Sequence, residues 1–95
     1  MVEIEQKNNL NFGEFFIVKQ GKNVGKMQYE WSNPLTFNIV HTEVDPEFEG
    51  QGFGKKLVNA AVDFARKEGK TIKATCSYAH SVLSKDDSVE DVFTK

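Results

Sequence analysis

Hydrophobic and polar residues alternate along the first half of the chain, and turn-forming residues separate the alternating segments. A period of two residues is typical of strands with one buried face. The intervening turns are rich in Asn and Gly, and one of them contains Pro34, residue types that favour tight turns. The pattern predicts four strands in an antiparallel meander, at residues 2–8, 12–20, 24–31 and 36–44.

Regular alternation sorts the side chains of the fourth predicted strand into two faces. One face would carry Phe37, Ile39, His41 and Glu43, and the other Thr36, Asn38, Val40, Thr42 and Val44. On this pattern His41 is expected to share the apolar face of Phe37 and Ile39.

The hydrophobic period changes from that of a strand to that of a helix in the second half of the chain. Apolar residues recur three and four apart from Lys55 to Glu68, and Gly69 stands where a helix end favours a left-handed residue. A fifth strand, a short helix and a last turn capped by residues 86–88 are predicted at residues 71–76, 78–85 and 89–93. A helical crossover between strands implies parallel pairing of the fourth and fifth strands. The predicted fold class is therefore α/β: an antiparallel four-strand meander, a helix, a fifth strand parallel to the fourth, and a short C-terminal helix.

Length and composition allow one hydrophobic core. The chain has 95 residues, 39% of them hydrophobic, so residues 1–95 are expected to form a single domain. The N-terminus has no basic start and no apolar segment of signal-peptide length, and no run approaches the length of a membrane span. We therefore expect a cytoplasmic monomer with no membrane partner.

Charge and cysteine content argue against several other kinds of partner. The formal net charge is −2 without a long run of like charge, whereas binding of nucleic acid requires a basic face. Cys76 is the only cysteine, so the chain can form no internal disulfide. Neither a C-x-x-C nor an H-x-x-x-H pair supports Cys76, His41 and His80 as metal ligands, and no metal site is predicted.

A glycine-rich segment between the fourth strand and the helix carries the strongest chemical signal. Gly50, Gly52 and Gly54 alternate with other residues directly before the predicted helix. Such a loop can aim several backbone N–H groups at one point, and the helix N-terminus adds free N–H groups and a positive dipole end. The segment predicts an anion site, for which phosphate is the usual ligand. The alternative is a tight strand-to-helix turn without a ligand.

Two nucleotide-binding patterns do not fit this segment. In the phosphate-loop pattern, Glu49 stands at the position of the first glycine and Lys56 at that of the final Ser or Thr. In the dinucleotide-binding pattern, Lys55 stands at the position of the third glycine.

Residues 44–57, VDPEFEGQGFGKKL, resemble instead the acetyl-CoA signature of the GNAT N-acetyltransferase superfamily, V-x-P-x-x-[RQ]-G-x-G-[IF]-[GA]-x-x-L. The segments HTEV at residues 41–44 and TCSY at residues 75–78 further resemble a small, single-domain, cysteine-containing subfamily, so that the resemblance covers nearly the whole chain. Two features depart from the superfamily. Glu49 replaces the usual Arg or Gln, which disfavours a pyrophosphate unless the carboxylate points away, and the N-terminal helical pair that helps form the acceptor site is absent.

The resemblance implies acetyl-CoA as the cofactor and transfer of its acetyl group to an amine or thiol acceptor that the sequence does not identify. It implies that the strand before the loop binds the pantetheine arm and that the loop amides hold the pyrophosphate. The implied cofactor-binding residues are Glu43, Val44, Gly50, Gln51, Gly52, Phe53, Gly54, Lys55 and Tyr78.

Cys76 and His41 are the candidate catalytic residues, because both are expected near the ends of the parallel strands. The thiol could accept the acetyl group by thioester exchange, with His41 as its base or ion-pair partner. Alternatively, His41 could deprotonate an amine for direct attack. A structural role in the core is the alternative for each residue, and a CoA-binding sensor or interaction module without catalysis is the alternative for the chain.

Overall fold

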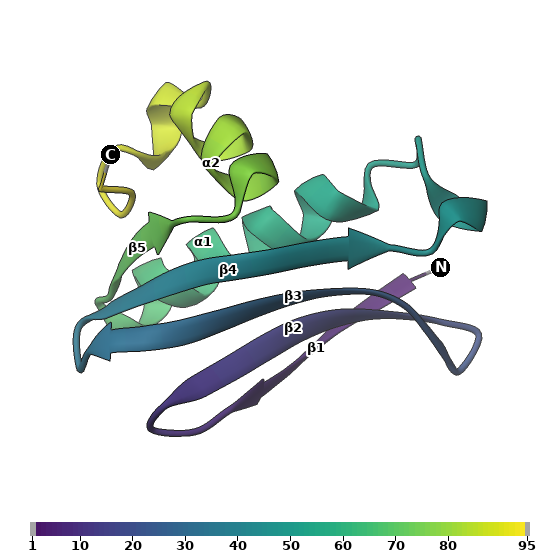
Figure 1. Ribbon diagram of the computed structural model, residues 1–95, viewed down its shortest axis with the longest axis horizontal. Coiled ribbons are helices and arrows are strands. Elements are labelled where there is room, and N and C mark those ends of the chain that lie inside the picture. Colours follow the sequence, from purple (N-terminus) through teal and green to yellow (C-terminus); the bar gives the residue numbers. More distant parts are fainter. Residues whose placement is uncertain (1, 95) are drawn as a thin grey trace.

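In the computed structural model, which describes residues 2–94, helices cover one face of a five-stranded sheet (Figure 1). The strands, in their order across the sheet, are β1 (Val2–Asn8), β2 (Phe12–Lys19), β3 (Lys22–Asn33), β4 (Thr36–Val44) and β5 (Thr71–Ala74). The helices are α1 (Phe53–Glu68) and α2 (Ser77–Ser84), with short 3₁₀ helices η1 (Pro46–Phe48) and η2 (Asp87–Val89). The first four strands pair antiparallel and β5 pairs parallel to β4, which confirms the predicted fold class.

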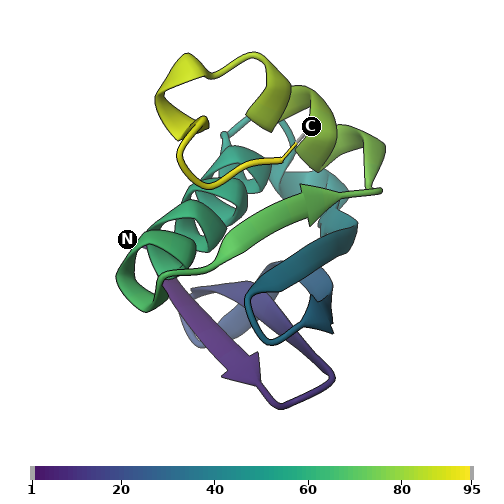
Figure 2. The ribbon, with the colours of Figure 1, turned by 90° about the vertical axis from the view of Figure 1, so that its left-hand side faces the viewer.

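The hydrophobic core lies between the sheet and α1. Alternate residues of β2 and β3 are buried, as expected for strands with one face on a core. The buried residues of α1 recur at helical spacing and are Phe53, Leu57, Val58, Ala61, Val62 and Ala65. Figure 2 shows α1 and α2 on the same side of the sheet. The opposite side, which carries none of the described helices, is called the open face below.

Several element ends differ from the predicted ones for identifiable reasons. α1 begins at Phe53 instead of Lys55, because Gly52 adopts a left-handed φ of 77° and is the N-cap. β5 ends at Ala74, so Cys76 is the N-cap of α2 and not a strand residue. Gly69 ends α1 in the left-handed conformation, as predicted.

A β-bulge in β4 separates two parts of the strand. Gln28 of β3 pairs with His41, but the next residue of β3, Tyr29, pairs with Ile39. Val40 is therefore the extra residue on β4. Because side chains alternate between faces along a strand, the phase of the alternation shifts by one residue across Val40.

The bulge places His41 on the open face. Thr42 pairs with the buried Met27 and so lies on the core side of β4, whereas its neighbours face away from the core. His41 Nε2 lies 3.7 Å from Glu43 Oε1, and both side chains are more than half exposed. The prediction that His41 and Glu43 share the apolar face of Phe37 is wrong, because it assumed a strand without a bulge.

Candidate functional site

The last part of β4 has no neighbouring strand on its β5 side. Residues 36–39 of β4 pair with residues 71–74, but β4 continues to Val44. The amides of Thr75 and Cys76 donate to the carbonyl oxygen of Ile39 at 3.1 and 3.0 Å, after which the chain enters α2. An unpaired strand edge of this kind can pair with a ligand that carries amide groups.

A cavity of about 450 Å³ lies along this free edge. Its walls come from the end of β4, the η1 segment with the glycine loop, the first turn of α1, and α2. The lining residues are Thr42, Glu43, Val44, Phe48, Glu49, Gly50, Gly52, Phe53, Gly54 and Tyr78. The structure thus brings together most of the predicted cofactor-binding residues; Gln51 and Lys55 are exposed and do not line the cavity.

The glycine loop positions the N-terminus of α1 at this cavity. Gly50 and Gly52 have φ angles of 84° and 77°, and a Cβ at either position would meet nothing within 4 Å. Glycine is therefore favoured by the left-handed backbone and not by lack of space. No side chain caps α1, and its first turn contains no acidic residue. The first amides of the helix have no intrahelical partner, so they remain available to an anionic ligand.

Tyr78 closes the cavity on the α2 side. A Cβ on Gly54 would lie 2.7 Å from Tyr78 Oη, so the tyrosine hydroxyl rests directly against the first turn of α1. Gly54 thus allows a close approach of two elements, which Gly50 and Gly52 do not.

Three lining residues, Thr42, Phe48 and Glu49, add to the predicted set. Phe48 stacks on Phe53 with ring centroids 5.9 Å apart, and the Lys19 ammonium lies 4.8 Å from the Phe48 centroid. Thr42 lines the cavity through the change of strand phase at Val40, the signal that could have identified it. Phe48 is recognisable in the sequence only as the single apolar side chain between two glutamates.

Glu49 gives the anion site an unusual charge. Its carboxylate is exposed and lines the cavity beside the glycine loop. A negative charge in the wall opposes a bound phosphate, by an amount that depends on separation and solvent screening. The exposed Lys55 and Lys56 lie on the first turn of α1 and carry the opposite charge.

Cys76 and His41 lie on different sides of β4. Cys76 is half-buried, and its Sγ lies 3.4 Å from Oγ1 of Thr42, on the core side of the strand. His41 faces the open side, where Glu43 is its charged neighbour. Cys76 therefore contacts Thr42, a residue of the cavity wall, but does not contact His41.

The remaining predicted features lie away from this site. His80 accepts or donates a hydrogen bond of 3.2 Å between its Nδ1 and the hydroxyl of Ser84 on the surface of α2. Within residues 2–94, no three His, Cys, Asp or Glu side chains gather as a metal site would require. In the same part of the chain, neither helix has the length and apolar character needed to cross a membrane.

Comparisons with solved structures and family models agree on one family. The model of the GCN5-related N-acetyltransferase family matches residues 14–92. A GCN5-like protein of Staphylococcus aureus, solved by NMR, has a TM-score of 0.73 and 37% identity over 95% of this chain and 87% of its own. An aminoglycoside N-acetyltransferase in complex with CoA has a TM-score of 0.68 over 100% of this chain and 89% of its own. At 12% identity, the second likeness shows the fold alone.

Curated sequences that resemble the chain are longer than it. Protein NATD1 of Xenopus tropicalis is 34% identical over 58 residues, which are 61% of this chain and 53% of the relative. Protein NATD1 of Homo sapiens is 31% identical over 58 residues, 51% of its length. The chain spans about half the length of these curated relatives in the matched region.

Proposed function

Because the chain belongs to the GCN5-related N-acetyltransferase family, we propose that it binds acetyl-CoA and transfers the acetyl group to an acceptor. One observation carries the proposal: the cavity of about 450 Å³ that combines a free strand edge with an uncapped helix N-terminus. The strand edge matches the amides of a pantetheine arm, and the helix N-terminus matches a pyrophosphate.

The order of these parts along the cavity gives the cofactor a direction. With its pyrophosphate at Gly52, the cofactor would be held by Glu43 and Val44 along its pantetheine arm, and Thr42 would lie near its acyl end. The CoA complex of an aminoglycoside N-acetyltransferase with the same fold supports this ligand.

When bound, acetyl-CoA supplies an acetyl group activated as a thioester. His41 is the candidate base for direct transfer: its imidazole accepts the proton that an attacking amine loses. This route needs no contact between His41 and Cys76, and the opposite placement of the two side chains favours it.

Cys76 is the candidate for a covalent route. Its Sγ lies beside Thr42 at the cavity wall and at the N-terminus of α2, where the helix dipole stabilises negative charge. The thiol would lose its proton and take the acetyl group from the cofactor, releasing free CoA, and then pass it to the acceptor. An acetylated Cys76, readily detected by intact mass after mixing with acetyl-CoA, distinguishes this route from the direct one.

A titration with acetyl-CoA tests the binding proposal, and the chain offers a matched pair of glycines for it. Gly52 and Gly21 have φ angles of 77° and 78°, and a Cβ at either would meet nothing within 4 Å. Alanine at either position is expected to reduce stability by about 1–2 kcal/mol, but only Gly52→Ala should weaken binding of acetyl-CoA, measured by calorimetry.

Three outcomes separate the alternatives. At 100 times its Kd, a ligand stabilises the folded state by about 2.7 kcal/mol. A melting temperature that does not change when acetyl-CoA is added therefore rejects the proposal. Binding without transfer to any amine of a panel supports a non-catalytic CoA-binding module. A mass increase of one acetyl group in the wild type, absent in Cys76→Ala and retained in His41→Gln, supports the covalent route through Cys76.

A further inference from the structure

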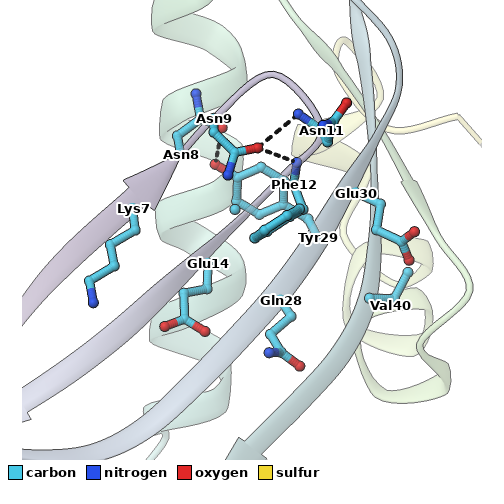
Figure 3. A pocket seen from close by; sticks show the side chains of 11 residues that line it. Lys7, Asn8, Asn9, Asn11, Phe12, Glu14, Gln28, Tyr29, Glu30 and Val40 are labelled. Atoms are coloured by element: carbon cyan, nitrogen blue, oxygen red, sulfur yellow. Dashed lines mark hydrogen bonds between the residues drawn. The ribbon is translucent and has the colours of Figure 1, made fainter.

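The open face carries a second cavity that the proposed cofactor site does not use. It has a volume of about 620 Å³ and lies where the ends of β1, β2 and β3 meet the bulge of β4 (Figure 3). Glu14, Gln28, Glu30 and Val40 are among its lining residues. Figure 3 shows the two carboxylates on either side of the Gln28 amide.

The strand register connects this cavity with His41. Glu14 pairs with Gln28, and Gln28 pairs with His41, so the three side chains form a row across the open face. Lys7 is the next residue of the row on β1. Because neighbouring strands lie about 4.8 Å apart, the backbone positions of Glu14 and His41 are separated by roughly 10 Å.

His41 also stands between the two cavities along β4. Val40 lines the open-face cavity, and Thr42 lines the cofactor cavity. The residue between them, His41, points its side chain to the open face. A molecule in the open-face cavity would therefore meet the imidazole from one side of the strand, while the cofactor approaches along the strand edge.

The charges of this cavity favour a cationic occupant. Within residues 2–94, neither Glu14 nor Glu30 lies within 4.0 Å of a Lys, Arg or His nitrogen. Lys26, the nearest basic residue of β3 to the row, is paired with Glu43 at 3.2 Å. Lys7 is the opposing charge: it lines the cavity, with its ammonium 5.6 Å from the centroid of the Phe16 ring.

Apolar side chains make up another part of the wall. Val40 is half-buried, and Phe12 of β2 is 58% exposed. Together with the amide of Gln28, they offer a surface suited to an aliphatic chain next to two carboxylates.

We propose that the open-face cavity binds an aliphatic diamine whose nitrogens are roughly 10 Å apart, the distance from Glu14 to His41 along the row. One ammonium is held by Glu14 and Glu30, and the alkyl chain crosses Gln28 and Val40. The second nitrogen lies at His41 as the free amine. As this nitrogen bonds to the acetyl carbonyl carbon, its proton passes to His41 and the carbon–sulfur bond breaks. The imidazolium then gives the proton to the sulfur, so that CoA leaves as the thiol. The role as acceptor rests on the proposed function, whereas binding of the diamine does not.

NMR titration of the isotope-labelled protein without acetyl-CoA tests the binding directly. The probe is diaminoheptane, and heptylamine is the matched control, since it keeps the chain and one nitrogen but lacks the second nitrogen. Diaminoheptane is expected to shift the amide signals of Glu14, Gln28, Glu30 and His41, and to bind about two- to tenfold more tightly than heptylamine, as one hydrogen bond between the second nitrogen and the His41 imidazole allows.

Substitutions that remove a charge from the cavity should change diaminoheptane affinity in opposite directions. Glu14→Gln and Glu30→Gln are each expected to weaken diaminoheptane binding about two- to fivefold, whereas Lys7→Gln should strengthen it. Glu90→Gln, an exposed carboxylate beside η2, is the control and should change nothing. If a glutamate variant fails to fold, the Lys7 variant and the comparison of the two amines still decide the question.

Equal affinity for the two amines, or unchanged affinity in all the charge variants, would overturn the diamine site. A failure of the proposed acetyl transfer would give a different result from a failure of the diamine site. Diaminoheptane that binds to a protein with no affinity for acetyl-CoA refutes acetyl transfer but leaves the diamine site standing. Acetyl-CoA that binds normally while diaminoheptane shifts none of the four amides refutes the diamine site alone.

Discussion

Gly13 and Gly54 each lie against the hydroxyl end of a tyrosine ring, yet alanine is expected to have very different effects at the two positions. At Gly13, an added Cβ would lie 2.5 Å from Cζ and Oη of Tyr29 and 2.6 Å from the carbonyl oxygen of Lys7. At Gly54, it would lie 2.7 Å from Oη and 2.9 Å from Cζ of Tyr78. Backbone is one of the obstacles at the first position, and only the tip of a side chain obstructs the second.

Gly13→Ala is expected to be strongly destabilising because Tyr29 cannot move away. Its side chain is only 1% exposed, and its hydroxyl accepts a hydrogen bond from Gln6 at 2.8 Å and donates one to Asn8 at 2.9 Å. Overpacking costs about 1–3 kcal/mol, and each lost hydrogen bond about 0.5–1.5 kcal/mol. The free energy of unfolding should fall by about 2–6 kcal/mol, which at about 4–8 °C per kcal/mol lowers Tm by at least about 8 °C.

Gly54→Ala is expected to keep or raise the free energy of unfolding. Tyr78 is 43% exposed, so its ring can swing into solvent when a methyl group appears on α1. In return, alanine is favoured over glycine within a helix by about 0.5–1 kcal/mol. The displaced ring belongs to the cofactor cavity, so acetyl-CoA binding should weaken although the fold does not.

Thermal and urea unfolding, followed by circular dichroism, measure both variants against the wild type. A loss of stability in Gly54→Ala as large as that in Gly13→Ala would refute the reasoning, since it would mean that burial of the tyrosine does not matter. A Gly13→Ala variant within about 3 °C of the wild type, less than the change expected for 1 kcal/mol, would refute the argument from backbone contact.

The remaining predictions concern two carboxylates. Glu49→Gln should tighten acetyl-CoA binding about two- to fivefold at low salt and less at high salt, because the Glu49 carboxylate opposes the pyrophosphate. Calorimetry measures the affinity, with Glu47→Gln as the control because Glu47 does not line the cavity. Equal effects of the two substitutions on affinity would contradict the prediction. Hydrogen bonds of 3.0 Å from Arg66 hold the pKa of Asp91 below its usual value. A depressed folded-state pKa stabilises the fold at pH values above the unfolded carboxyl pKa, and this stability is lost as the pH falls through the folded-state pKa. Asp91→Asn should therefore flatten the acid side of the plot of Tm against pH. An unchanged slope would count against the Arg66–Asp91 pair.

Features that depend on local pattern could be predicted from the sequence. The helical period of α1, the left-handed Gly69 and the alternation in β2 each follow from residues close together in the chain, and the structure has them all. The order of residues 44–57 predicted an anion-binding loop before the helix, and in the structure a cavity lies beside that loop. The approach of Tyr78 to Gly54 could not be predicted in this way, because it depends on how α2 packs against α1.

The side of β4 on which His41 lies depends on the β-bulge at Val40, which leaves a trace in the local sequence but is located only by the strand register. In the first part of β4 the apolar side chains occupy odd positions, Phe37 and Ile39, whereas Val40 and Val44 occupy even ones. A change of phase inside one strand indicates an extra residue, and the register places that residue at Val40. A regular β4 would have turned the imidazole toward the side of Cys76 and made a thiol–imidazole pair possible. Because of the bulge, His41 instead lies on the open face. A mechanism that uses His41 as the base must therefore bind the acceptor on the open face.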